Sequence, residues 1–247
     1  MSDANNPKQR ARRQVKQHVD LLHSAGVEFV AIPPDRPMEP IAAEPTQGAA
    51  TVDTSDTRRK ALGVLAEEVA KCDRCPELYS TRTQTVFGTG PLSADLCFVG
   101  EAPGADEDRQ GVPFIGAAGQ LLTKIIMAME LTRDEAYICN TLKCRPPNNA
   151  TPTPQQCTNC RPFFERQLDL VQPKFICCLG GVAAQNVLNT KVGITKLRGQ
   201  FYEYRGIPVL CTFHPSYLLR DPSKKKDVWE DMKTLLTRMG RPIPAGK

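Results

Sequence analysis

Residues 95–104 read DLCFVGEAPG, a short apolar run that ends in a turn-forming segment. Such runs are typical of strands buried inside a parallel sheet. Three more follow, at residues 136–139, 175–179 and 207–213, and helical segments alternate with them at residues 119–131, 154–171, 182–188 and 228–239. The alternation predicts an α/β fold, a three-layer sandwich with a central, mostly parallel four-stranded sheet and helices on both faces.

An alternating segment, Phe201 to Tyr204, is followed by Arg205-Gly206 and is predicted to form a hairpin with the last strand. The predicted domain spans residues 58–240, and residues 241–247 form a tail. Residues 1–57 differ in composition: we expect a short helix over 11–25, then a flexible, proline-punctuated linker. That helix is either an accessory element or a docking peptide for a protein partner, and its amphipathicity does not separate the two.

Composition sets broad limits on the class of protein. The chain has 247 residues, 40% of them hydrophobic, which is enough for one compact domain with an appendage. A net charge of +5 is compatible with a polyanionic partner but does not require one. Neither a signal-peptide pattern nor a run of about 20 apolar residues occurs. We therefore expect a soluble, cytoplasmic, monomeric protein without a membrane partner.

Polar residues follow the predicted strands at the point where each one ends. Glu101 comes after the first strand, Asn140 after the second, Gly180-Gly181 after the third and His214 after the fourth. Because the carboxyl ends of parallel strands share one edge, where open α/β sheets bind ligands, these residues should line one crevice. Each signal is weak alone, since such residues also occur in ordinary turns, but their convergence predicts a site.

The ten cysteines fall into two groups. Five lie within apolar strands and are expected to be buried and inert: Cys97, Cys139, Cys177, Cys178 and Cys211. Cys72 and Cys75 form a C-x2-C unit, and Cys144, Cys157 and Cys160 lie in or beside the loop after the second strand. Four thiolates for a metal centre could be Cys72 and Cys75 with either Cys157 and Cys160 or Cys144 and Cys160, and spacing does not decide.

Four motifs, in order along the chain, resemble those of the family 4 uracil-DNA glycosylases, the iron–sulfur branch of that superfamily. They are Gly100-Glu101-Ala102-Pro103-Gly104, Pro113-Phe114-Ile115-Gly116, Asn140 with Cys144-Arg145-Pro146-Pro147, and His214-Pro215-Ser216-Tyr217-Leu218-Leu219-Arg220. The resemblance covers about residues 60–239. It implies an enzyme that flips uracil out of single- or double-stranded DNA and hydrolyses its N-glycosidic bond, leaving an abasic site.

The resemblance also implies a cofactor. Family members hold one [4Fe-4S] cluster through cysteines that match Cys72, Cys75, Cys144 and Cys160. A structural role is the conservative interpretation, because base excision by hydrolysis transfers no electrons. The role of Cys157 stays open.

Site residues are carried over position by position. The base pocket is expected at Gly100, Ala102, Glu107, Phe114 and Asn140. Phe114 would stack on uracil and Asn140 would pair with its O4 and N3–H, while Glu107 would exclude the methyl group of thymine. His214 would stabilise the charge that develops on uracil O2. Family 4 lacks an aspartate one residue after Glu101, so Glu101 or Asn149 is expected to position the attacking water.

The DNA-binding segment is predicted at Ser216, Leu218, Leu219 and Arg220, with one of the two leucines wedged into the base stack. Basic residues elsewhere are expected to meet phosphates: Lys143, Arg145, Lys196, Arg198 and Lys224-Lys225-Lys226.

Two rival functions stay open at this point. A non-catalytic, metal-stabilised nucleic-acid-binding module would need neither Asn140 nor His214 at the crevice. A nucleotide hydrolase would use the acids at positions 101, 106, 107 and 108 to bind magnesium, but the phosphate-binding motif G-x-x-x-x-G-K-[ST] does not occur.

Overall fold

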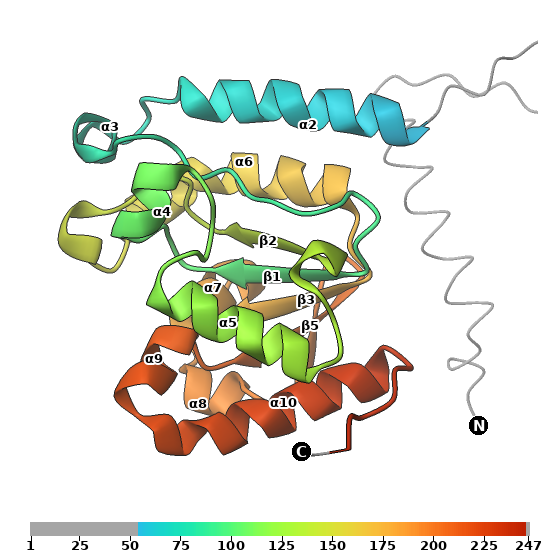
Figure 1. Cartoon of the computed structure of the whole chain (residues 1–247). Helices are drawn as coiled ribbons and strands as arrows, with labels where there is room; N and C mark the ends of the chain where they lie inside the picture. The colour runs from blue at the N-terminus through green and yellow to red at the C-terminus, as the bar shows by residue number, and fades with distance from the viewer. Residues whose placement is uncertain (1–53, 246–247) are drawn as a thin grey trace, which may run out of the picture. The chain divides into compact units, whose positions relative to one another are not determined.

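The computed structural model describes residues 54–245 (Figure 1), so the predictions for residues 11–25 and for the linker up to residue 53 lie outside the described part. Residues 54–57, expected in the linker, instead form the first turn of a helix that begins at Thr54. Its sheet has five strands in the order β2-β1-β3-β5-β4. They are β1 (Leu96–Gly100), β2 (Ala136–Asn140), β3 (Phe175–Leu179), β4 (Phe201–Tyr204) and β5 (Ile207–Thr212). The four predicted parallel strands are confirmed, and the hairpin strand β4 adds an antiparallel fifth at the edge.

The β4–β5 hairpin turns through two residues only. Arg205 and Gly206 both have positive φ angles, +51° and +82°. This geometry is that of the tight turns whose twist matches paired strands, and a glycine at the second position adopts it without steric strain. The Arg205-Gly206 pair therefore fixes the register in which Tyr204 lies opposite Ile207.

Nine α-helices surround the sheet in the described part of the chain. They are α2 (Thr54–Ala70), α3 (Pro76–Thr81), α4 (Ala105–Gln110), α5 (Ala117–Ala128), α6 (Pro154–Val171), α7 (Gly181–Leu188), α8 (Ile194–Leu197), α9 (Pro215–Arg220) and α10 (Lys225–Arg238). Three short 3₁₀ turns join them, η1 (Arg133–Glu135), η2 (Pro147–Asn149) and η3 (Pro222–Lys224). Within residues 54–245, no helix is both long and apolar enough to cross a membrane.

Two hydrophobic clusters, one on each face of the sheet, confirm the three-layer arrangement. Side chains of α5, α9 and α10 pack on the face that carries Phe98 and Ile138. Those of α6, α7 and α8 pack on the face that carries Val99 and Cys178. Helix α2 lies outside α6, as Figure 1 shows, with Leu65 packed near Phe163.

The five strand cysteines, Cys97, Cys139, Cys177, Cys178 and Cys211, are each 0% exposed, so their predicted burial is confirmed. They are small apolar side chains that fit between the closely packed strands and the helices.

Strand register brings the predicted loops together. Gly100, the last residue of β1, lies opposite Asn140, the last residue of β2. Leu179 at the end of β3 lies opposite Thr212 at the end of β5. The loops after these four parallel strands therefore leave the sheet along one carboxyl edge, as predicted.

Candidate active site

A cavity of about 530 Å³ opens at this carboxyl edge. Residues from the loops after all four parallel strands line it. They include nine of the predicted site residues: Glu101, Ala102, Glu107, Phe114, Asn140, Asn149, His214, Ser216 and Arg220. The volume lies within the range of small-molecule pockets in proteins.

Asn140 presents an unsatisfied hydrogen-bond acceptor to the cavity. Its side chain is buried, with 2% of the residue exposed. Its Oδ1 is the one buried side-chain nitrogen or oxygen without a hydrogen-bond partner within residues 54–245. Because buried polar atoms are almost always paired, an orphaned acceptor at a cavity wall indicates a ligand that brings an N–H group.

Phe114 lies beside that amide in the cavity wall, in a left-handed backbone conformation with φ of +53°. Two glycines make this arrangement possible. A Cβ on Gly100 would lie 2.3 Å from Oδ1 of Asn140 and 2.5 Å from Cζ of Phe114. A Cβ on Gly119 would lie 1.9 Å from the carbonyl carbon of Phe114. Gly100 thus leaves room for the side chains of Asn140 and Phe114. Gly119 leaves room for the backbone of Phe114, and the sequence interpretation missed it.

Glu107 fixes the loop that carries Phe114. Its carboxylate accepts hydrogen bonds from three backbone N–H groups, those of Gly104 (3.1 Å), Ile115 (3.0 Å) and Gly116 (3.0 Å). These bonds tie α4 to the segment immediately after Phe114. The side chain also lines the cavity, and its exclusion of the thymine methyl group stays a prediction. The three hydrogen bonds give Glu107 a second role, which is to fix this loop.

His214 caps the start of α9 through its imidazole ring. Nδ1 accepts a hydrogen bond from the backbone N–H of Ser216 (3.1 Å) and lies 2.7 Å from the Ser216 hydroxyl. Since a backbone N–H can only donate, the neutral ring carries its proton on Nε2. Burial, with a smaller contribution from Arg220, lowers the pKa of His214 to about 4, so the ring is neutral near pH 7.

The ring of His214 lies beside Phe114, with 5.6 Å between the two ring centroids. Behind it, Gly180 has φ of +94°, and a Cβ there would come 3.0 Å from Cβ of His214. A glycine at position 180 thus lets the end of β3 approach the histidine closely.

Two polar residues remain as candidates for positioning water. Glu101 lines the cavity, and burial raises the pKa of its carboxyl group. Asn149 lines it too, and its Oδ1 accepts a hydrogen bond from Nε of Arg145 (2.8 Å). Both residues line the same cavity, so the geometry does not choose between them.

The predicted DNA-binding segment needs one correction. Leu218 is 1% exposed and packs in the core beside α5 and α10, so it has no free surface for a wedge. Leu219 is 49% exposed. Of the two leucines, the structure therefore favours Leu219.

One predicted phosphate contact, that of Lys143, is wrong as well, and a second, that of Arg198, is disfavoured. Lys143 is 1% exposed, and its Nζ donates to the Asn140 carbonyl (2.8 Å) and to Oε1 of Gln167 (2.5 Å). Arg198 is paired with the buried Asp231. Both cations are committed to internal contacts.

A separate small cavity gathers four of the cysteines: Cys72, Cys75, Cys144 and Cys160. They come from the end of α2, the start of α3, the loop after β2 and α6. Two of the sulfur atoms accept hydrogen bonds, Cys144 from Arg82 (3.1 Å) and Cys75 from Asn159 (3.4 Å). Donors of this kind, one of them cationic, suit a sulfur-rich group of negative charge.

Cys157 is set apart from that cavity. Its Sγ accepts a hydrogen bond from Nδ2 of Asn186 (3.3 Å), and it lines a different cavity, beside α7. In the part of the chain that the structure describes, no three His, Cys, Asp or Glu side chains are placed to hold a single metal ion. The place of Cys157 favours the ligand set that contains Cys144 over the set that contains Cys157.

Comparison with known proteins identifies relatives of the chain. The family model for the uracil DNA glycosylase superfamily matches residues 87–233. The type-4 uracil-DNA glycosylase of Thermotoga maritima is 43% identical over 181 residues, 72% of this chain and 94% of the relative. That of Archaeoglobus fulgidus is 38% identical over 193 residues, 75% and 96%. A type-5 enzyme of Pyrobaculum aerophilum is 30% identical over 186 residues, 62% and 82%.

Proposed function

Since the chain belongs to the uracil DNA glycosylase superfamily, with type-4 enzymes among its relatives, we propose that it excises uracil from DNA. It would flip the nucleotide out of the base stack and hydrolyse the N-glycosidic bond, which leaves an abasic site. The observation that carries this proposal is the orphaned Oδ1 of Asn140 at the wall of a cavity that also holds Phe114 and His214.

Uracil has the complementary pattern for the Asn140 amide. Its N3–H would donate to Oδ1, and its O4 would accept from the amide nitrogen. Cytosine reverses both positions. Its N3 acceptor would face the Oδ1 acceptor, and its amino donor would face the amide donor, in a buried site. Pockets built to match a substrate's hydrogen bonds discriminate by about 10⁴–10⁵-fold in this way.

His214 would act when the bond breaks. Negative charge develops on the base as the glycosidic bond lengthens, and the Nε2–H group of the neutral ring is a donor for uracil O2. Nδ1 is held by Ser216, so the donor is oriented before the reaction begins. Glu101 or Asn149 would orient the water that attacks the sugar carbon.

Three of the four acids that a magnesium-dependent hydrolase would use are already engaged, and the fourth, Glu101, lines the cavity. Asp108 is buried and accepts from the backbone N–H of Thr83 (3.0 Å). Asp106 pairs with Arg109, and Glu107 holds three backbone N–H groups. These contacts favour the glycosylase over the hydrolase.

The test is release of free uracil from single- and double-stranded oligonucleotides that contain one uracil. The proposal expects free base and alkali-labile abasic sites. Binding of DNA without release of base would support the non-catalytic module instead. Hydrolysis of nucleotides with intact DNA would support the hydrolase.

For the cofactor, we propose that Cys72, Cys75, Cys144 and Cys160 hold one [4Fe-4S] cluster. Four thiolates around one cavity are the donor set that such clusters use. The group would clamp the segment after α2 to the loop after β2 and to α6. The loop after β2 carries Cys144 only four residues after Asn140, the residue proposed to read the base.

Cys144→Ser is expected to abolish the brown colour and the bound iron and sulfide of anaerobically purified protein, because one ligand of four is lost. Cys157→Ser is the matched control and should keep both, since Cys157 lies outside the cavity. Absorbance spectra together with iron, sulfide and zinc analysis measure the result. Stoichiometric zinc without iron in the unmodified protein would contradict the proposed cofactor.

A further inference from the structure

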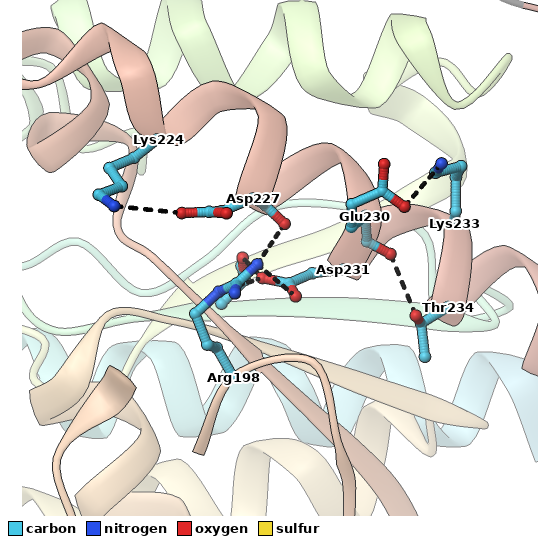
Figure 2. Close-up of polar contacts among 8 residues, drawn as sticks. Arg198, Lys224, Asp227, Glu230, Asp231, Lys233 and Thr234 are labelled. Carbon is cyan, nitrogen blue, oxygen red and sulfur yellow. Dashed lines mark hydrogen bonds and ion pairs between the residues drawn. The ribbon is translucent and has the colours of Figure 1, made fainter. Parts of the chain in front are cut away.

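Arg198 and the buried Asp231 form a partly buried ion pair between the segment that precedes β4 and helix α10 (Figure 2). Nη2 of Arg198 lies 2.9 Å from Oδ1 of Asp231, and Nε lies 3.1 Å from Oδ2. The side chain of Asp231 is 2% exposed and that of Arg198 21%. Replacing such pairs with apolar side chains often leaves stability unchanged or raises it, so stability alone does not explain the pair.

The same carboxylate holds the end of β5. Thr212, the last residue of that strand, is fully buried and donates its hydroxyl to Oδ2 of Asp231 at 2.6 Å. His214 follows two residues later. Between them, the ring of Phe213 lies under the guanidinium of Arg198, 5.2 Å from the ring centroid. The ion pair therefore contacts both residues that lead into His214.

The backbone beside Arg198 is shaped for this contact. Gly199 has φ of +73°, and a Cβ there would come 3.0 Å from Oδ1 of Asp231. Its N–H donates to the Cys211 carbonyl at 3.2 Å, which ties this segment to β5. On the other side, Phe213 contacts Tyr217 (5.1 Å between centroids), which lines the active-site cavity. The contacts run without a break from α10 to the cavity wall.

We propose that Asp231 is a positioning residue for His214, which it acts on through Thr212 and through Arg198. Asp231 does not line the cavity and would not touch DNA. It would fix the carboxyl end of β5 and thereby the direction of the Nε2–H donor. This proposal rests on the proposed function, because it assumes that His214 donates to uracil O2 during excision.

Thr212→Val removes the hydroxyl and Asp231→Asn removes the charge, each with little change of shape. Since displacement of a reacting group by about 1 Å can cost about 10²-fold, each should slow single-turnover excision at saturating enzyme by about 10-fold or more. The Kd for uracil-containing DNA should change by less than about twofold. Both act through one carboxylate, so the double variant should be no slower than the slower single variant. Thr212→Ser retains the hydroxyl and should retain the rate.

The matched control lies next along the same helix. Glu230→Gln breaks the exposed pair with Lys233, labelled in Figure 2, and should leave the rate unchanged. Rates are normalised to the folded fraction from circular dichroism at the assay temperature. Thr212→Val and Asp231→Asn rates equal to wild type after this normalisation would overturn the inference, as would a defect in Kd alone. An unmodified chain that releases no uracil would overturn the proposed function instead.

Discussion

Asn140→Asp is expected to lower uracil excision by on the order of 10⁴-fold, the scale at which matched hydrogen-bonding sites reject unmatched groups. The carboxylate keeps an acceptor for uracil N3–H but loses the amide donor for O4. It also adds a buried negative charge beside a base that becomes negative as its bond breaks. Single-turnover rates with saturating enzyme and a uracil-containing strand measure the loss.

Asn189→Asp is the control for this substitution, because Asn189 is an exposed residue at the end of α7, where the added carboxylate faces solvent. It should excise uracil at the wild-type rate. Unchanged excision by Asn140→Asp would show that another residue reads the base, and the orphaned acceptor would then need a different ligand.

His214→Ala is expected to slow excision by about 10²–10³-fold and to leave the affinity for uracil-containing DNA nearly unchanged. Charge reaches uracil O2 only as the glycosidic bond lengthens, so a donor aimed there favours the transition state over the bound substrate. A histidine that only shapes its loop would weaken DNA binding along with the rate. His214→Asn separates the two roles, because its side-chain oxygen can still cap α9 while the ring donor is lost. Recovery of the rate in that variant would remove His214 from the chemistry.

The pH profile gives a second check on His214. Burial lowers its pKa to about 4, so the neutral ring is the form present in ordinary buffers. As pH falls from about 8 to about 5, His214 should contribute no change in the single-turnover rate. Protonation would fill Nδ1 with a proton only as pH approaches 4, and the bond from the Ser216 N–H would then be lost. Titration of the His214 ring itself near 6.5, followed through its ring protons by NMR, would contradict the buried, neutral ring.

Much of the fold follows from the sequence because buried parallel strands leave a strong signal. The apolar run at residues 175–179 coincides with β3, the alternating segment 201–204 coincides with the antiparallel edge strand β4, and the predicted helix over 154–171 coincides with α6. That helix begins where Thr153 caps it by accepting from the N–H of Gln156. Helices of six residues, such as α4 and α9, have too few turns to show a period and were not predicted.

The limits of the site prediction have the same physical origin. Leu218 and Leu219 are adjacent, so only the rotational phase of α9 decides which one is exposed, and six residues do not fix that phase. Lys143 and Arg198 carry charges that the sequence alone assigns to the surface. Each has its partner far along the chain, Gln167 or Asp231, and only the packed structure brings them together. Gly119 is the first residue of the helix expected over 119–131, where a glycine is unremarkable. Because α5 begins at Ala117, this glycine lies inside the helix, where it is unfavourable unless a neighbour needs the space.

The cavity is assembled from four loops that are spread over more than a hundred positions, from Glu101 to Arg220. The amide on β2 and the imidazole after β5 meet only when β1 and β3 lie between them. A molecule in which these four strands are not assembled therefore lacks the whole site and does not keep a damaged, indiscriminate form of it. For a catalyst that cuts bases out of a genome, failure by inactivity is the harmless kind.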